Sequence, residues 1–242
     1  MLTDNEIKII ADHFKKKIET IKPLSDAYYY NHLSLCVIEA VWSLGVKYQS
    51  VINVVQRYCT KRNLEPYRGK NLCDSSSYPE KTQQESITCF LQYVKEFSFC
   101  QLADTVFENC QRTSTRNGIL KAEAVVKFAK VLLKYDVNYF QDIGRLENNI
   151  AFEGDINAIP GQKSGLSLDY FYMLAGDENR TKADRMIKRF LAVPIRREPN
   201  TISVPCAKDA LRRLFLVLDD DCIKSVRHLD NIIWDYQRRQ TQ

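Results

Sequence analysis

The fold is decided by the stretch Ile159-Pro160-Gly161-Gln162-Lys163-Ser164-Gly165, which separates two apolar segments with helical spacing. Proline and glycine end the first helix, and glycine permits the tight turn from which the second helix starts. The stretch therefore predicts a helix–hairpin–helix. In such a turn the backbone can approach a phosphate closely, while the second helix directs its N-terminal N–H groups and its dipole at the anion. Any antiparallel pair of helices can use a glycine turn, so the motif does not establish DNA binding by itself.

The composition of the chain favours helices throughout. Only 8 of the 242 residues are glycine and 7 are proline, whereas an all-β sandwich or barrel needs many tight turns that use those residues. Apolar residues recur at helical spacing, and no stretch alternates long enough to indicate a sheet. We therefore predict an all-α protein. The predicted helices lie at about 3–20, 32–45, 49–62, 80–96, 98–110, 119–134, 137–143, 145–158, 166–175, 184–192, 205–217 and 222–238.

The charge of the chain is unevenly distributed. The whole sequence has 35 Lys and Arg residues against 30 Asp and Glu, a net charge of +5, which permits an anionic partner without indicating one. Between residues 159 and 197, however, eight basic residues accompany four acidic ones. Basic side chains beside a phosphate-binding turn favour contacts with a DNA backbone, although a solvated basic face is their commoner role. The candidate phosphate contacts are Lys182, Arg185 and Arg189.

The sequence lacks the patterns of membrane, secreted and metal-binding proteins. No apolar run reaches the length of a membrane span, so we expect no membrane partner. The first residues are polar and acidic, unlike a secretory signal. The eight cysteines include no Cys-x-x-Cys pair, which disfavours a metal tetrad. Several of them, such as Cys36, lie in apolar helical patterns, which is typical of buried thiols in a reducing compartment. We expect a cytoplasmic, DNA-associated monomer without a bound metal centre.

Asp184 stands where the last apolar helix of the hairpin segment gives way to the next predicted helix. Aspartate is a common N-cap, because its carboxylate accepts the N–H groups of the first turn, and capping is one role for this residue. The same N–H groups would keep the carboxylate ionised at a rigid position, which suits a group that stabilises a developing cation. The capping role and a catalytic role are compatible.

The segment from the hairpin to Asp184 resembles the helix–hairpin–helix (HhH-GPD) DNA glycosylase superfamily, which includes endonuclease III, 8-oxoguanine glycosylase and alkyladenine glycosylases. The signature of that family is a Leu-Pro-Gly-type hairpin, an apolar helix, a loop with glycine or proline, and an essential Asp. Ile159-Pro160-Gly161 matches the start of the hairpin, and Asp184 matches the Asp. Residues 116–125 are similar to the family's Gly…Lys-Ala helix start and residues 36–43 to its early buried helix. The resemblance covers about residues 30–191.

The chain departs from the family pattern at the hairpin and after it. Lys163 replaces the second hairpin glycine, so the turn is not expected to be a copy of the family's turn. Gly165 stands where bifunctional members carry the lysine that forms a Schiff base, so the resemblance implies hydrolysis without strand cleavage. We favour a phosphate contact for Lys163, and substitution for the missing lysine is the alternative. Only Cys206 and Cys222 follow Asp184, so no iron–sulphur cluster is expected, while a structural monovalent cation at the hairpin stays open.

The resemblance implies that a base leaves the duplex and enters a pocket with aromatic walls. The last predicted helix carries Asp230 and Trp234 at the i, i+4 spacing, the spacing of the polar and aromatic residues that contact the base in 8-oxoguanine glycosylase. Residues at this spacing share one helix face. Trp42 and Tyr170 are further candidates for the pocket wall. Packing in the core is the competing role for each of these aromatic side chains.

These inferences combine into one functional hypothesis. The resemblance implies a two-lobed fold, with one lobe at 28–172 that ends in the helix–hairpin–helix, a second lobe at 1–27 and 173–242, and a cleft between them that holds Asp184. The implied function is a monofunctional DNA glycosylase that flips a modified or damaged base of double-stranded DNA and hydrolyses its N-glycosidic bond. Pro160 to Gly165 would bind the DNA. The alternatives are a non-catalytic helix–hairpin–helix protein that binds damaged or modified DNA, and a helical interaction protein.

Overall fold

The computed structural model describes residues 1–25, 28–69 and 77–240, and it is helical throughout this part of the chain. Extended pairing in the described ranges is limited to isolated bridges between Tyr30 and Tyr67 and between Arg112 and Leu120. The prediction of an all-α protein is therefore confirmed. No helix among these residues has the length and apolar character needed to cross a membrane.

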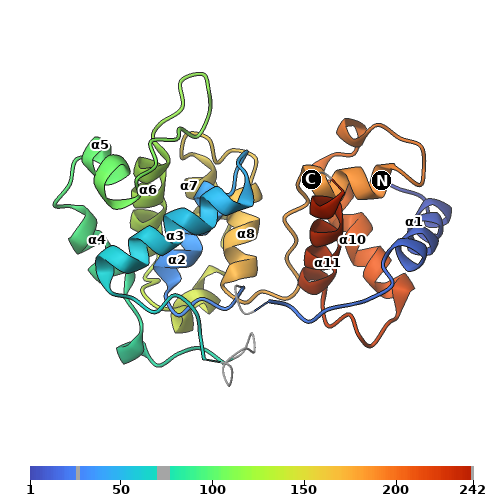
Figure 1. Cartoon of the computed structure of the whole chain (residues 1–242), viewed down its shortest axis with the longest axis horizontal. Helices are drawn as coiled ribbons and strands as arrows, with labels where there is room; N and C mark the ends of the chain where they lie inside the picture. The colour runs from blue at the N-terminus through green and yellow to red at the C-terminus, as the bar shows by residue number, and fades with distance from the viewer. Residues whose placement is uncertain (26–27, 70–76, 241–242) are drawn as a thin grey trace. The chain divides into compact units, whose positions relative to one another are not determined.

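The helices form two compact units. Unit 1 combines Met1–Ser25 with Asp177–Gln242, and unit 2 is Asp26–Gly176. In Figure 1 the helices α1, α10 and α11 belong to unit 1 and the helices α2 to α8 to unit 2. The lobes expected from the sequence have their boundaries at residues 28 and 172.

Unit 2 is organised around two helices that are buried on nearly every side. Every residue of α2 (Leu33–Trp42) is buried, and so is every residue of α8 (Leu166–Leu174) after the first. Helices that are apolar all round belong in the interior of a domain, and these two pack against each other. The surrounding helices are α3 (Tyr48–Arg62), η3 (Lys81–Gln83), α4 (Ile87–Val94), α5 (Phe99–Gln101), η4 (Leu102–Val106), α6 (Lys121–Lys134), η5 (Phe140–Leu146) and α7 (Ile150–Asn157).

The buried Lys121 at the start of α6 closes the C-terminal end of α2. Its Nζ donates hydrogen bonds to the carbonyl oxygens of Trp42 at 2.9 Å and of Leu44 at 2.8 Å. The last carbonyls of a helix have no partner within the helix and carry partial negative charge, so a buried ammonium group is suited to this position. The contact joins the end of α2 to the start of α6, two segments that lie 79 residues apart in the sequence.

The hairpin between α7 and α8 turns on two glycines with positive φ. Gly161 has φ +87° and Gly165, the N-cap of α8, has φ +71°. A side chain at Gly161 would overlap Thr113, which lies directly against the turn. Lys163 has no positive φ, so the second left-handed residue of this hairpin is Gly165 and not the residue at position 163. The turn tolerates lysine there because the glycine requirement falls two residues later.

The described residues of unit 1 form five helical segments that pack around a hydrophobic core. They are α1 (Asp4–Lys17), α9 (Arg185–Ala192), η6 (Pro199–Thr201), α10 (Val204–Leu218) and α11 (Val226–Arg239). A capping box opens α1, with Thr3 accepting the Glu6 N–H at 3.2 Å and Glu6 accepting the Thr3 N–H at 2.8 Å. Phe190 of α9 lies at the centre of the core, edge-on to Phe14 and Tyr236. The core therefore joins the N-terminal helix to helices from the end of the chain.

The geometry of the hairpin predicts the effect of a methyl group at position 161. We expect Gly161→Ala to lower the free energy of unfolding by about 1–3 kcal/mol, because alanine would meet both the positive φ and the Thr113 side chain. Urea denaturation followed by circular dichroism measures the change. Gly154→Ala in α7 is the matched control, since nothing lies within 4 Å of a Cβ there. We expect that control to gain up to about 1 kcal/mol, and equal losses in the two variants would contradict the analysis.

Candidate functional site

Asp184 is the N-cap of α9 and its side chain is half-buried. Its Oδ1 accepts the N–H of Met186 at 2.8 Å and the N–H of Ile187 at 3.4 Å. Both donors lie within three residues of the acceptor, so the local sequence is sufficient to produce the cap. The bonds fix the carboxylate relative to the axis of α9. Its second oxygen, Oδ2, makes no hydrogen bond to any residue that the structure describes.

The residue before Asp184 has an unusual backbone. Ala183 is completely buried and has φ +43°. A residue with a side chain rarely adopts this left-handed conformation, which costs of order 1–2 kcal/mol. Such a conformation persists only where the surrounding contacts hold it, so the direction in which the chain enters α9 is determined by its neighbours.

The neighbour that holds this segment is Asp230 of α11. Its Oδ2 accepts a hydrogen bond from the Thr181 hydroxyl and another from the Lys182 N–H at 3.1 Å. Asp230 is only 4% exposed, and its carboxylate is directed at residues 181 and 182. The i, i+4 spacing correctly indicates a shared helix face with Trp234, but it does not say whether that face meets solvent or the interior.

The surroundings of Asp230 change its acidity. The pKa of Asp230 is raised to about 7, chiefly by burial. The negative charge of Asp184 adds to the rise, and the hydrogen bonds from Thr181 and Lys182 oppose it, so the value of about 7 is the balance of these effects. The two carboxylates therefore have very different surroundings although they interact. One is half-buried and accepts two helix N–H groups, whereas the other is enclosed. Pairs of this kind are a common source of acid and base groups in enzymes.

A second contact with α11 holds the other end of the same loop, which comprises residues 177–184. Arg227 has no exposed surface, and its Nη1 lies 3.1 Å from Oε1 of Glu178. The Ser225 hydroxyl donates to Oε2 of Glu178, and the Arg227 N–H donates to the Glu178 carbonyl at 3.0 Å. The sequence analysis missed Glu178, Thr181 and Arg227, because no local pattern marks contacts that span more than forty residues.

The other proposed residues of the last helix and of α9 lie at the surface of the same unit. Trp234 is half-buried and packs against the unit 1 core, with the Arg238 guanidinium 5.1 Å from the centre of its ring. Arg185 is exposed and Arg189 half-buried, on the side of α9 opposite the buried Ile187 and Phe190. The side chain of Lys182 is half-buried, and its backbone N–H is bound to Asp230.

The six predicted DNA-binding residues of the hairpin differ in their exposure to solvent. Pro160, Gly161, Lys163 and Ser164 are exposed, whereas Gly165 is half-buried and Gln162 has no exposed surface. Oε1 of Gln162 accepts a hydrogen bond from the Ser167 hydroxyl in the first turn of α8. Through this bond the Gln162 side chain stabilises the turn from within.

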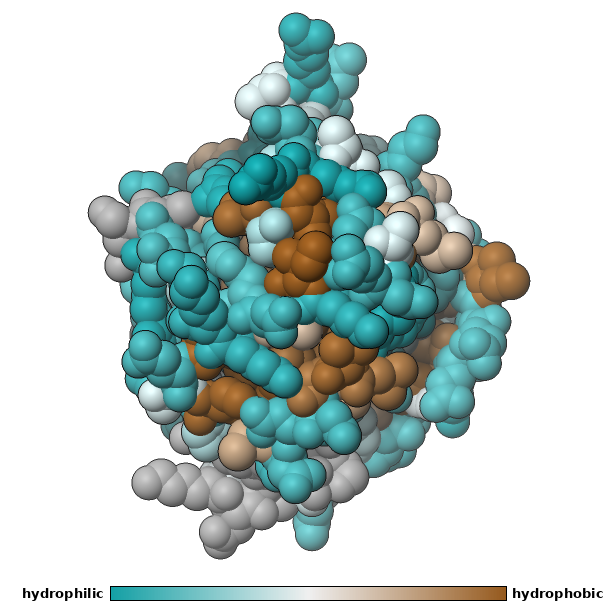
Figure 2. Space-filling model, turned by 90° about the vertical axis from the view of Figure 1, so that its right-hand side faces the viewer, coloured by the Kyte–Doolittle hydropathy of each residue, from teal (hydrophilic) through white to brown (hydrophobic). Residues whose placement is uncertain are grey.

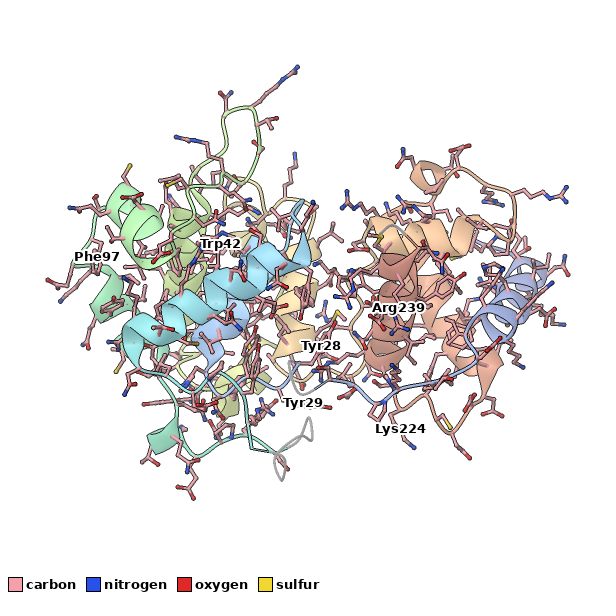
Figure 3. The ribbon with its side chains drawn as sticks, viewed as in Figure 1. Tyr28, Tyr29, Trp42, Phe97, Lys224 and Arg239 are labelled. Atoms are coloured by element: carbon pink, nitrogen blue, oxygen red, sulfur yellow. The ribbon has the colours of Figure 1, made fainter. Side chains whose placement is uncertain are left out.

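Trp42 and Tyr170 belong to the interior of unit 2. Trp42, labelled in Figure 3, has no exposed surface and its ring centre lies 4.6 Å from that of Phe107. Tyr170 is 6% exposed and donates a hydrogen bond to the buried Glu39 at 2.6 Å. Both residues lie on the helices that are buried all round, and for this reason neither presents a face to a ligand in this structure.

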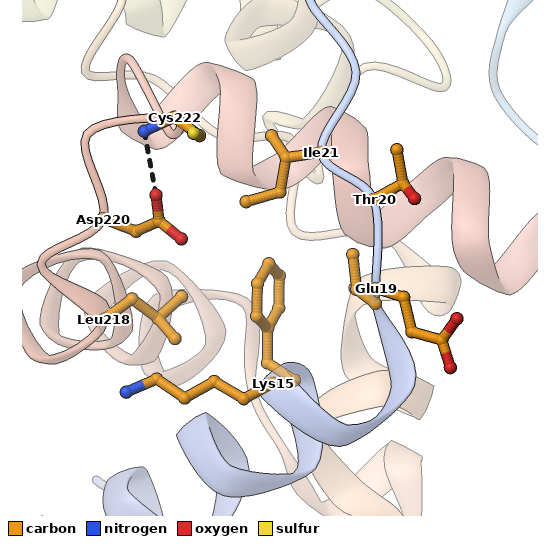
Figure 4. A pocket seen from close by; sticks show the side chains of 9 residues that line it. Lys15, Glu19, Thr20, Ile21, Leu218, Asp220 and Cys222 are labelled. Carbon is orange, nitrogen blue, oxygen red and sulfur yellow. Dashed lines mark hydrogen bonds between the residues drawn. The ribbon is translucent and has the colours of Figure 1, made fainter.

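Unit 1 contains a hollow of about 410 Å³ that other residues line. Phe14, Ile18, Ile21 and Leu218 supply apolar surface, and Lys15, Glu19 and Asp220 supply charged groups (Figure 4). Apolar patches interrupt the hydrophilic surface of the face shown in Figure 2. None of the candidate residues lines the hollow.

No three His, Cys, Asp or Glu side chains in the described ranges gather as a metal site.

One family model matches nearly the whole chain. It is described as Domain of unknown function (DUF8548), and it matches residues 8–238. The chain belongs to this family. The matched residues include parts of both units, the hairpin and both carboxylates. No curated protein matches the chain. No solved structure matches it.

The raised pKa of Asp230 predicts how the stability of this DUF8548 protein depends on pH. The folded protein keeps a proton on Asp230 up to about pH 7, whereas unfolded Asp loses it near pH 4. The stability that this proton contributes is present at low pH and is lost as the pH rises towards 7. We therefore expect Asp230→Asn to lose less free energy of unfolding than the wild type between about pH 5 and about pH 8.

Chemical denaturation at the two pH values measures this difference. Asp235→Asn is the matched control, because Asp235 is on the same helix and pairs at the surface with Arg238. The control should follow the wild type. A pH dependence in Asp230→Asn as steep as that of the wild type would contradict the prediction.

Proposed function

We propose that the chain is a monofunctional DNA glycosylase that removes a modified or damaged base from double-stranded DNA and leaves an abasic site. The proposal includes the two-lobed, glycosylase-like arrangement that the resemblance implies. The observation that carries it is the geometry of Asp184, which is bound through one carboxylate oxygen to two helix N–H groups while the other oxygen has no partner among the described residues.

This geometry suits the chemistry of N-glycosidic bond cleavage. As the bond between C1′ and the base nitrogen breaks, its electron pair leaves with the base and positive charge develops on the sugar. A fixed carboxylate beside C1′ stabilises that charge. The same carboxylate can orient a water molecule, whose oxygen bonds to C1′ while a proton is released, and the departing base takes up a proton. Because Asp184 is already held by the backbone, little reorganisation is needed during the reaction.

The proposed contacts with DNA come from the exposed parts of the hairpin and of α9. Lys163 and Ser164 are exposed at the hairpin, beside the start of α8, and Arg185 is exposed in the first turn of α9. Lysine and arginine side chains at such positions neutralise phosphates and place the protein on the duplex without reading its sequence. The residue aligned with the lyase lysine is Gly165, so the proposal is hydrolysis without strand cleavage.

The test of the function is a screen of duplexes that each carry one modified base, with detection of the free base by mass spectrometry. Asp184→Asn should lower the rate of base release by about a hundredfold or more, because it removes the charge that stabilises the cationic sugar. Asparagine caps helices as well as aspartate does, so α9 should keep its start and the fold its stability. Asp184→Ser gives a second cap without a carboxylate. Unchanged release in both variants would refute the catalytic role.

The screen also decides between the proposal and the non-catalytic alternative. Binding of duplexes with an abasic site, without release of any base from any substrate, would establish a DNA-binding protein that lacks chemistry. Trapping by borohydride would detect an amine adduct with the sugar, and its loss in Lys163→Ala would show that Lys163 replaces the missing lysine. We expect no adduct.

The contact with DNA makes its own prediction. Lys163→Ala and Arg185→Ala should each weaken binding to any duplex and lower the slope of log K against log salt by about one. Fluorescence anisotropy of a labelled duplex over a range of salt concentrations measures the slope. Lys95→Ala is the control, because Lys95 is an exposed lysine at the end of α4, away from the hairpin in the sequence. Equal slopes in all variants would exclude these side chains from the interface.

A further inference from the structure

We propose that Asp230 is a positioning residue, whose buried carboxylate holds residues 181–183 in the backbone conformation that presents Asp184. The inference rests on the function proposed above for Asp184, and it assigns to Asp230 a role other than contact with a base. Asp230 acts through the backbone and through its charge, and it does not touch the reacting atoms.

The hydrogen bonds of Asp230 are made to the segment that leads directly into α9. One oxygen of its carboxylate accepts both the Thr181 hydroxyl and the Lys182 N–H. Thr181 is 1% exposed, so its hydroxyl would lose its acceptor if the Asp230 carboxylate were removed, and water would reach that hydroxyl poorly. A buried polar group that loses its partner is costly. The two bonds therefore restrict residues 181 and 182 strongly.

The backbone of Ala183 shows what these bonds maintain. Its positive φ is followed by the extended conformation of Asp184, with φ −75° and ψ −171°. The chain is held by Asp230 at residues 181 and 182 and by the α9 N–H groups at Asp184. Between these points Ala183 adopts a left-handed conformation that alanine otherwise avoids. The ion pair between Glu178 and Arg227 holds the loop three residues earlier and does not reach this turn.

The charge of Asp230 provides a second route to Asp184. The charged groups that act on the Asp230 carboxyl are Asp184 at the start of α9 and Lys182 in the loop. Because the pKa of Asp230 is raised to about 7, chiefly by burial, its carboxyl changes charge near neutral pH. The ionised form accepts stronger hydrogen bonds from Thr181 and Lys182 and adds a second negative charge beside Asp184. A cationic sugar at Asp184 should therefore be bound more tightly above pH 7 than below it.

The experiment compares two duplexes that differ only in the sugar at one abasic position. One carries a pyrrolidine analogue with a protonated ring nitrogen, and the other carries the neutral tetrahydrofuran analogue. The ratio of their dissociation constants isolates the electrostatic preference for the cation from general DNA binding. In the wild type we expect the preference for pyrrolidine to rise by about tenfold between pH 6 and pH 8, the size of one pKa unit of interaction.

Variants of both partners separate positioning from simple stability. Asp230→Asn should show a small preference for pyrrolidine that does not change with pH. Thr181→Val removes one donor and keeps the Asp230 carboxylate. It should weaken the preference for pyrrolidine and move the increase in this preference to higher pH. Thr181→Ser should restore the size of the preference and the pH at which it increases. Asp235→Asn, on the same helix but bound at the surface, should behave as the wild type. A wild-type pH dependence in Asp230→Asn, or in Thr181→Val if Asp230→Asn does not fold, would overturn the proposal.

A measurement without DNA keeps this inference distinct from the proposed function. In carbon-13 spectra of the free protein, the carboxyl signal of Asp184 should show an inflection near pH 7 that reports the ionisation of Asp230, and Asp230→Asn should remove it. If the wild type has no preference for pyrrolidine but the inflection is present, the glycosylase proposal fails and the link between the carboxyls stands. If the inflection is absent from the wild type, the positioning role fails.

Discussion

The candidate site depends on the hydrogen bonds and the ion pair that join α11 to the loop 177–184. Arg227 is completely buried and pairs with Glu178, and Asp230 accepts hydrogen bonds from Thr181 and Lys182. Because the Arg227 guanidinium is removed from water, its pairing with Glu178 offsets part of the cost of burying that charge. The loop ends at Asp184. The cap at Asp184 is local, but the direction in which the chain enters α9 depends on these contacts with a helix much later in the chain.

The parts of the structure that arise from local interactions could be predicted from the sequence. The capping box at Thr3 and the cap at Asp184 join groups within three residues of each other, so residue type and spacing suffice to predict them. The helices α2 and α8 are predominantly apolar, and a helix of that composition belongs in the interior of a domain. The hairpin follows from proline and glycine in the same way, because their allowed backbone angles are a property of the residue.

The parts that arise from distant contacts could not be predicted. The spacing of Asp230 and Trp234 places them on one face of α11, but the packing of α11 against α9 turns that face partly inward. Gln162 occupies the middle of a polar turn, where exposure is the ordinary expectation, and its burial depends on Ser167 one turn into the next helix. The helix expected at 98–110 is interrupted by the π-helical segment Leu102–Val106, for which the residues offer no signal. In each case the outcome depends on a partner whose position is known only once the chain has folded.

The two carboxylates are linked by conformation as well as by charge. The donors that hold residues 181 and 182 are the same groups that favour the ionised form of Asp230, and they oppose the effect of burial on its pKa. By reciprocity, a proton on Asp230 replaces charge-assisted hydrogen bonds by weaker neutral ones and loosens the segment before Asp184. Conversely, any contact that tightens this segment lowers the proton affinity of Asp230. A ligand that orders the loop would therefore release a proton from the interior of unit 1, and the added negative charge would lie beside the carboxylate that the same loop presents.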